Sequence, residues 1–226
     1  MKIALLLTGY LRKHRENWWM LHSNLISKFN TDTYCTTWDI QENGIPTKNE
    51  DFSDYKDRDN LKKITIINSE EYNKNKPIFK KLDRENDIFD VDERAKFHGE
   101  YWVNRLMDQW YLVKKSFESI DNPQQYDKII RFRYDIWLEN FVLIDNNHIT
   151  IPKDESFVWD YSDHMAYGNY DVMNKYCHIY DHIFKLYEKY NIDVSHAVNM
   201  LKFYIGEFEP KIQTTVDPNL VYKINK

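Results

Sequence analysis

Charged residues at alternate positions close an apolar segment in the stretch YDKIIRFRYD, residues 126–135. Two isoleucines typical of a buried strand are followed by Arg131, Arg133 and Asp135 at every second position. Because side chains along a strand alternate between its two faces, the three charges are predicted to share one face. Charges inside a sheet are costly unless they are paired, so this end of the strand calls for a partner or a ligand.

Two kinds of chemistry fit these residues. In the first, Arg131 and Arg133 neutralise a diphosphate and orient Asp135, whose carboxylate holds Mg²⁺ or Mn²⁺ bridging the phosphates. In the second, the residues form a structural Arg–Asp network without any ligand. A single carboxylate is a poor cation site unless phosphates and water complete its shell, so the metal stays open.

Candidate binding residues also stand at the ends of two other segments with strand character, KIALLL (2–7) and TDTYCTTWD (31–39). They are Thr8, Gly9, Tyr10 and Arg12 after the first segment, and Trp38 and Asp39 at the end of the second. A glycine permits a tight turn and close backbone approach, and hydroxyl and guanidinium groups bind a pyrophosphate. An aromatic face beside a carboxylate suits a nucleoside or a sugar. The structural alternative, a turn followed by a surface arginine, stays open because a single glycine is a weak signal for phosphate binding.

A further carboxylate, Asp163, lies in the apparent loop WDYSDHMAYGN, residues 159–169. There it would act as general base on an acceptor hydroxyl, or contact the acceptor, which requires hydrogen-bond reach rather than a fixed spacing. The alternative is that Asp163 caps a turn or a helix. The neighbouring His164 adds little to either interpretation.

The pattern of strands and helices is typical of an α/β domain. Apolar runs predict strands at 2–7, 31–39, 61–69 and 127–134, with short closing strands in KIQTTV and LVYKI. Three- and four-residue spacing predicts helices at 14–29 and 97–120, and near 169–177, 178–190 and 194–206. A short helix is expected at 78–82 within an otherwise irregular, charged segment, 72–93.

The alternation predicts one domain over residues 1–226, with a mostly parallel central sheet flanked by helices and a C-terminal helical elaboration. In such open sheets, ligands bind beyond the carboxyl ends of the strands. The charged and aromatic residues described above are predicted to follow just those ends. The sheet would therefore bring them together.

Composition excludes several classes of protein. The 31 Lys and Arg residues against 36 Asp and Glu give a net charge of −5, which argues against nucleic acid as a partner. Two distant cysteines and the absence of HExxH give no zinc site, and GxGxxG, GxxxxGK[ST] and GxSxG are also missing. The first apolar run is too short to cross a membrane, so we expect a soluble cytoplasmic protein, with peripheral contact at the membrane surface as an alternative.

Five segments together resemble the WavE-like lipopolysaccharide-synthesis family and related glycosyltransferases of GT-A-type fold. They are KIALLLTGYLR, TDTYCTTWD, QWYLVKKSFE, YDKIIRFRYD and DHMAYGNYDVMNKY, in this order between residues 2 and 176. The resemblance implies a nucleotide-sugar donor, such as a UDP- or GDP-sugar, bound over the strand ends. It also places RFRYD where GT-A enzymes carry a DxD metal motif, with Asp135 as the last aspartate and Arg133 in place of the first.

The resulting expectation is a glycosyltransferase that moves a sugar from a nucleoside diphosphate to a hydroxyl of a glycan, a lipid-linked glycan or a glycoprotein. Arg133 and Asp163 are the predicted catalytic residues. Two alternatives stay open: a sugar nucleotidyltransferase, disfavoured because TGYLRKHR has only one glycine, and a non-catalytic module that binds a glycan or a nucleotide.

Overall fold

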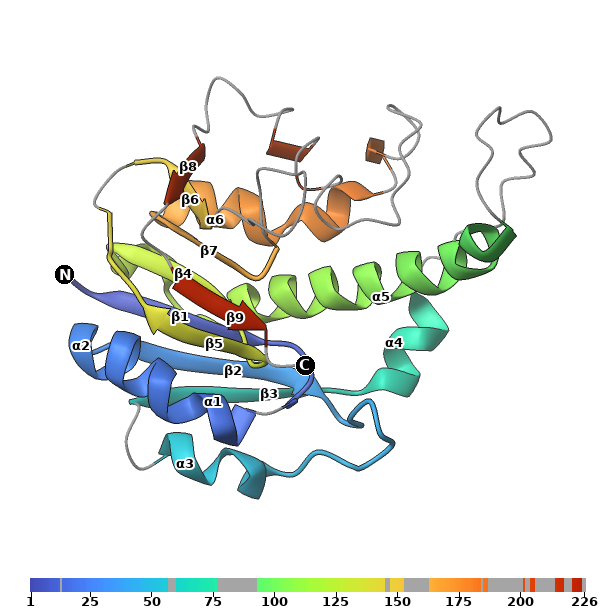
Figure 1. Ribbon diagram of the computed structural model, residues 1–226, viewed down its shortest axis with the longest axis horizontal. Helices are drawn as coiled ribbons and strands as arrows, with labels where there is room; N and C mark the ends of the chain where they lie inside the picture. Colours follow the sequence, from blue (N-terminus) through green and yellow to red (C-terminus); the bar gives the residue numbers. More distant parts are fainter. Residues whose placement is uncertain are drawn as a thin grey trace.

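The computed structural model describes most of the chain (Figure 1). The described residues are 1–12, 14–56, 60–76, 93–144, 147–152, 163–183, 185–186, 201, 204–205, 214–217 and 221–224. The predicted helix at 78–82 lies outside them, as does nearly all of the predicted helix near 194–206.

A mixed, mostly parallel sheet forms the centre, in the order β3-β2-β1-β4-β7-β6-β8. The strands are β1 (Ile3–Thr8), β2 (Asp32–Trp38), β3 (Leu61–Ile67), β4 (Lys128–Arg133), β6 (Ile149–Pro152), β7 (Met165–Gly168) and β8 (Thr214–Asp217). The first four run parallel, and β7 pairs antiparallel with β4. A second, two-stranded sheet joins β5 (Ile136–Asn140) to β9 (Val221–Ile224).

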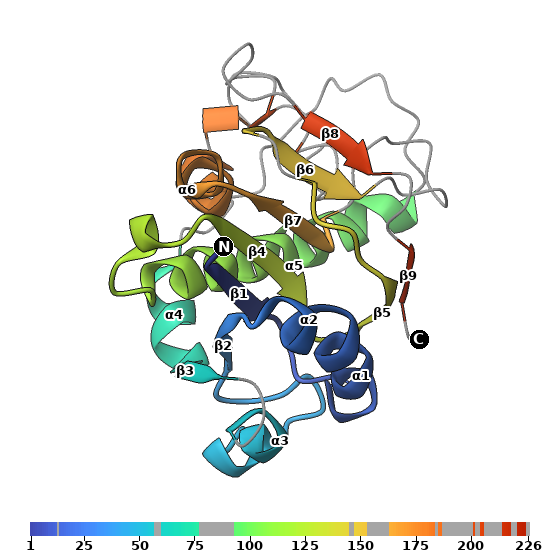
Figure 2. The ribbon, with the colours of Figure 1, turned by 90° about the vertical axis from the view of Figure 1, so that its left-hand side faces the viewer.

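Helices cover both faces of the sheet (Figure 2). They are α1 (His14–Leu21), α2 (Ser27–Phe29), α3 (Ser53–Lys56), α4 (Ser69–Asn75), α5 (Glu93–Glu118) and α6 (Tyr170–Cys177), with a π-helical turn η1 (His22–Ile26) between α1 and α2. Short 3₁₀ turns are η2 (Asn49–Phe52), η3 (Pro123–Gln125) and η4 (Ile179–His182).

Two large apolar cores result, one on each face of the sheet. Strand β1 supplies both, because Ala4 and Leu6 face α5 and α6 while Ile3, Leu5 and Leu7 face α1 to α3. A strand buried on both sides reads as a continuous apolar run, which is why this segment was recognisable from sequence. Helix α5 contributes an apolar stripe to the first core through Leu106, Trp110, Val113 and Phe117.

The predicted α/β architecture with a mostly parallel sheet and flanking helices is confirmed. The prediction was wrong for WDYSDHMAYGN, since Met165–Gly168 is strand β7 inside the sheet rather than part of a loop. Sequence reasoning also missed β5, β6 and α4. None of the helices in the described part of the chain is long and apolar enough to cross a membrane.

Candidate functional site

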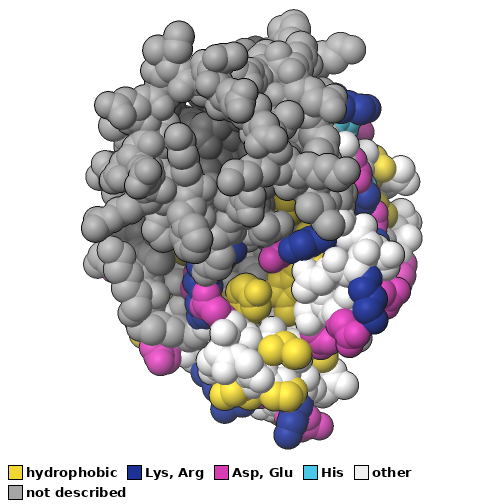
Figure 3. Space-filling model, turned by 90° about the vertical axis from the view of Figure 1, so that its right-hand side faces the viewer, with side chains coloured by type: hydrophobic (Ala, Val, Ile, Leu, Met, Phe, Trp, Pro, Cys, Tyr) yellow, Lys and Arg dark blue, Asp and Glu magenta, His cyan; other side chains and the backbone are white. Residues whose placement is uncertain are grey.

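The candidate site lies between β1 and β4, where the order in which successive strands are added to the sheet changes direction. From β1 the chain moves outward through β2 and β3, and then returns to place β4 on the other side of β1. Open α/β sheets bind ligands at such a switch point, beyond the carboxyl ends of the strands. Thr8 and Arg133, the last residues of β1 and β4, are register partners. Viewed from this end, the surface carries charges of both signs beside hydrophobic side chains (Figure 3).

Arg133 and Asp135 form the central ion pair of the site. Arg133 donates from Nε to Asp135 Oδ1 at 2.9 Å and from Nη2 to Oδ2 at 2.5 Å, a two-pronged pairing. Arg12, from the loop after β1, places Nη1 3.9 Å from Asp135 Oδ2. The carboxylate therefore holds one arginine tightly and lies within ion-pair distance of a second.

Asp163 stands just before β7 and closes the other side of this arrangement. Its Oδ2 accepts a hydrogen bond from Gln109 Nε2 at 2.6 Å and lies 3.8 Å from Arg133 Nη1. Its Oδ1 lies 3.4 Å from His164 Nε2. Since Met165 pairs with Phe132, β7 brings the two residues before it to the end of β4. Arg133 thus lies between two carboxylates.

These contacts set the protonation states. Burial raises the pKa of Asp163, but His164, which is protonated at acidic pH, outweighs burial together with Arg133 and Arg131 and holds that pKa at about 2. Burial likewise opposes ionisation of Asp135, yet the paired Arg133 lowers the pKa of Asp135 overall. Burial lowers the pKa of His164 and Asp163 offsets this only in part, so a neutral imidazole is expected at neutral pH.

Arg131 shares a face with Arg133 but lies deeper. Its side chain is 0% exposed, donates from Nε to Thr8 Oγ1 at 3.2 Å and from Nη1 to the Asp163 carbonyl, and lies over the Trp110 ring. The two arginines were predicted to lie on one face of β4, with Phe132 on the other. Phe132 does lie in the core on the opposite face of the sheet from Trp110, which Arg131 contacts. Arg131 ties β1 to the start of β7 beneath the site.

The loop after β1 is shaped by Gly9, whose φ of +121° is a conformation that side chains disfavour. Tyr10 follows it, half-buried, with the Arg12 guanidinium over its ring. The backbone N–H of Leu11 donates to Gln41 Oε1 at 2.7 Å, which fixes the loop to the segment after β2. The predicted turn is therefore present, and it aims Arg12 along the strand ends.

Two predicted ligand-binding residues, Trp38 and Asp39, have partners within the protein. Trp38 is 3% exposed, with its ring 4.9 Å from that of Tyr72 and stacked at 6.1 Å on Tyr111. Asp39 accepts a hydrogen bond from the Ser69 N–H at 3.0 Å, at the start of α4. In this structure, neither side chain joins the ion pairs around Arg133.

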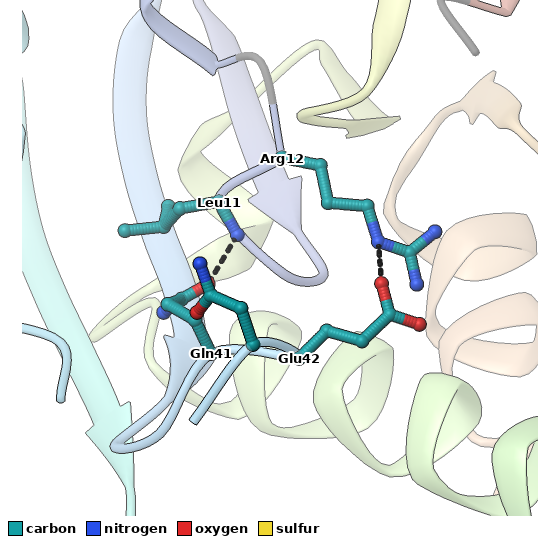
Figure 4. A pocket seen from close by; sticks show the side chains of 5 residues that line it. Leu11, Arg12, Gln41 and Glu42 are labelled. Atoms are coloured by element: carbon teal, nitrogen blue, oxygen red, sulfur yellow. Dashed lines mark hydrogen bonds and ion pairs between the residues drawn. The ribbon is translucent and has the colours of Figure 1, made fainter. Parts of the chain in front are cut away.

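Sequence reasoning missed Glu42, Arg105 and Gln109. Glu42 lies after β2 and forms ion pairs with Arg12 and with Arg105 of α5. A pocket of about 280 Å³ opens here, lined by Leu11, Arg12, Gln41, Glu42 and Asn43 (Figure 4). No motif marks Glu42, Arg105 and Gln109, because they come from two separate segments, the loop after β2 and helix α5, that only the fold brings together.

The two carboxylates do not fit a divalent cation as they stand. Mg²⁺ needs six oxygen ligands in a near-octahedral shell, and here both oxygens of Asp135 are engaged by Arg133. Among the described residues, no three His, Cys, Asp or Glu side chains gather as a metal-binding group. A cation at Asp135 would require Arg133 to move away, so the metal stays a prediction.

Comparison with protein-family models gives no match, and comparison with curated proteins gives none either. The resemblance to the WavE-like family therefore rests on the sequence segments alone.

Proposed function

We propose that the protein is a glycosyltransferase of GT-A type that uses a nucleoside-diphosphate sugar. The observation that carries the proposal is the position of Arg12, Arg133, Asp135 and Asp163 at the switch point between β1 and β4. A nucleotide-binding sheet would hold its donor there. The segments that resemble the WavE-like family supply the reaction class, which the geometry alone does not define.

The arginines would act on the leaving group. As the sugar departs, negative charge grows on the diphosphate, and fixed cations aimed at it lower the barrier. Arg133 is held in place by Asp135 and reaches the strand ends, so we assign it the direct contact. Arg131 is fully buried and would act by positioning Thr8 and Asp163.

Asp163 would contact the acceptor rather than remove its proton. A pKa of about 2 makes this carboxylate a weak base at neutral pH. Ionised and hydrogen-bonded to Gln109, it is suited to accept a hydrogen bond from an acceptor hydroxyl. The acceptor class, a glycan, a lipid-linked glycan or a glycoprotein, follows from the resemblance.

One observation favours a second candidate, a module that binds a glycan or a nucleotide without catalysis. The charges of the site already pair with one another, as a purely structural network would. The two candidates differ in turnover, since only the enzyme releases a nucleoside diphosphate from its donor.

The test is incubation with a panel of UDP- and GDP-sugars and mixed saccharide acceptors, followed by measurement of released nucleoside diphosphate and of labelled product. We expect transfer from at least one donor, and its loss in Asp135→Asn, because the neutral amide no longer holds Arg133 by charge. Transfer by Asp135→Asn at the wild-type rate from every accepted donor would remove the assigned role of this residue.

A further inference from the structure

A hairpin that follows β2 lies beside the candidate site. Residues 40–47 fold back through an Ile40–Pro46 bridge and turn at Gly44, whose φ is +78°. Its base is anchored to β2, since Thr47 donates from Oγ1 to the Trp38 carbonyl at 2.7 Å and from its N–H to the Asp39 carbonyl. The backbone of the hairpin is thereby fixed, and its tip carries Glu42 beside the loop after β1.

Glu42 bridges two arginines from different elements. Its Oε2 lies 2.6 Å from Arg12 Nε, and its Oε1 lies 2.5 Å from Arg105 Nη2 on α5. In Figure 4, the Arg12 and Glu42 side chains point toward one another beside the pocket. Two guanidinium groups that each hold one oxygen of the same anion form the arrangement that also binds two oxygens of a phosphate.

We infer that Arg12 and Arg105 form an anion site for one phosphate of a diphosphate ligand, and that Glu42 occupies this site until the ligand displaces it. Glu42 is suited to leave because its side chain is 46% exposed, and an exposed ion pair contributes little to stability. The pocket of about 280 Å³ beside Leu11 gives the entering group space.

The position of the site relative to Arg133 indicates a diphosphate rather than a single phosphate. Arg12 contacts Glu42 through Nε and lies 3.9 Å from Asp135 through Nη1, so it links the anion site to the Arg133–Asp135 pair. One phosphate would take the place of the Glu42 carboxylate, and the next would lie toward Arg133. This inference rests on the proposed function for the identity of the ligand, but not for the existence of the anion site.

The test is calorimetric titration with inorganic pyrophosphate at low ionic strength. Glu42→Gln removes the competing charge and keeps the size of the side chain, so we expect pyrophosphate affinity to rise about 2- to 5-fold, the fold-change that corresponds to an exposed ion pair. Glu70→Gln is the matched control, since Glu70 is an exposed partner of Lys74 on α4, and we expect no change. Adding Arg105→Gln to Glu42→Gln should abolish the gain.

An unchanged affinity in Glu42→Gln, or a gain that survives Arg105→Gln, would overturn the anion site. Each variant is first checked by circular dichroism and thermal unfolding, and Arg12→Gln in the Glu42→Gln background gives a second, independent loss of affinity. A tighter pyrophosphate complex without any use of nucleotide sugars would support the anion site and refute the glycosyltransferase. Sugar transfer by the wild type together with an unchanged pyrophosphate affinity in Glu42→Gln would support the glycosyltransferase and refute the anion site.

Discussion

Arg131 and Arg133 differ in what they can reach, although they are two residues apart on one strand. Arg131 is enclosed by the core and bound to Thr8 and to the Asp163 carbonyl, whereas Arg133 is about one-fifth exposed and lies at the strand end. Period-two alternation predicts which face a side chain takes, but not how deeply it lies along the strand. That depth separates a positioning residue from one that contacts a ligand.

Substitution of each arginine should therefore give different results. We expect Arg133→Gln to weaken nucleoside diphosphate binding about 10- to 100-fold, the value of a charged hydrogen bond to phosphate. Arg131→Met should weaken it less than about 5-fold in a folded variant, since Arg131 contacts Thr8 and the Asp163 carbonyl inside the protein rather than the proposed ligand. Calorimetric titration of both folded variants measures this. Equal losses in the two variants would contradict the difference in reach between Arg131 and Arg133.

Asp163 gives a pH-dependent contribution to stability. Its pKa of about 2 in the folded chain lies below the ordinary value, so the ionised form stabilises the fold above about pH 4, and this contribution disappears as the pH falls through 2. The shift corresponds to about 2–3 kcal/mol at pH 7.

Urea unfolding of the wild type and Asp163→Asn at several pH values tests this contribution. The difference in unfolding free energy between the two should shrink to roughly half between pH 7 and pH 3, because the protonated acid resembles the amide. A difference that stays constant or grows as the pH falls would contradict the assignment.

Among the elements, the short antiparallel strand β7 escaped prediction. Met-Ala-Tyr-Gly has no β-branched residue and only four positions, so neither composition nor alternation marks it as a strand. Its pairing with Ile129–Phe132 of β4 is long-range, which no local pattern reports. The long helix α5 and strand β1 were predictable from their own residues. Helix α5 has apolar residues at helical spacing, and β1 is a continuous apolar run.

Strand β7 should be sensitive at Gly168, where it meets α6. A Cβ added there would lie 2.3 Å from Val172 Cγ2 and 3.2 Å from the His148 carbonyl oxygen. We expect Gly168→Ala to destabilise the protein by about 1–3 kcal/mol, the usual cost of overpacking. Thermal and urea unfolding measure it.

The double variant Gly168→Ala/Val172→Ala separates overpacking from other causes. Removing the Val172 methyl groups relieves the clash, so the double variant should lose less stability than the sum of the two single variants. Strict additivity would mean that the added methyl group does not act through Val172.

At the scale of the whole molecule, alternation of strands and helices was enough to predict the α/β class and the edge of the sheet that carries the charges. The site itself was only partly predictable. Thr8, Arg133, Asp135 and Asp163 do meet at that edge, while Trp38 packs against Tyr72 and Asp39 accepts a hydrogen bond from Ser69. The bridge from Arg12 through Glu42 to Arg105 joins segments that are far apart in sequence, so only the folded chain reveals it.

The most direct test of the central claim is calorimetric titration of the wild-type protein with UDP and with GDP, each with EDTA and with Mn²⁺. The sheet-edge site predicts that at least one nucleoside diphosphate binds, and that binding weakens with added salt because arginines hold the phosphates. With Arg133 paired to Asp135, binding should persist in EDTA. Failure of both nucleotides to bind, with or without Mn²⁺, would contradict the proposed function.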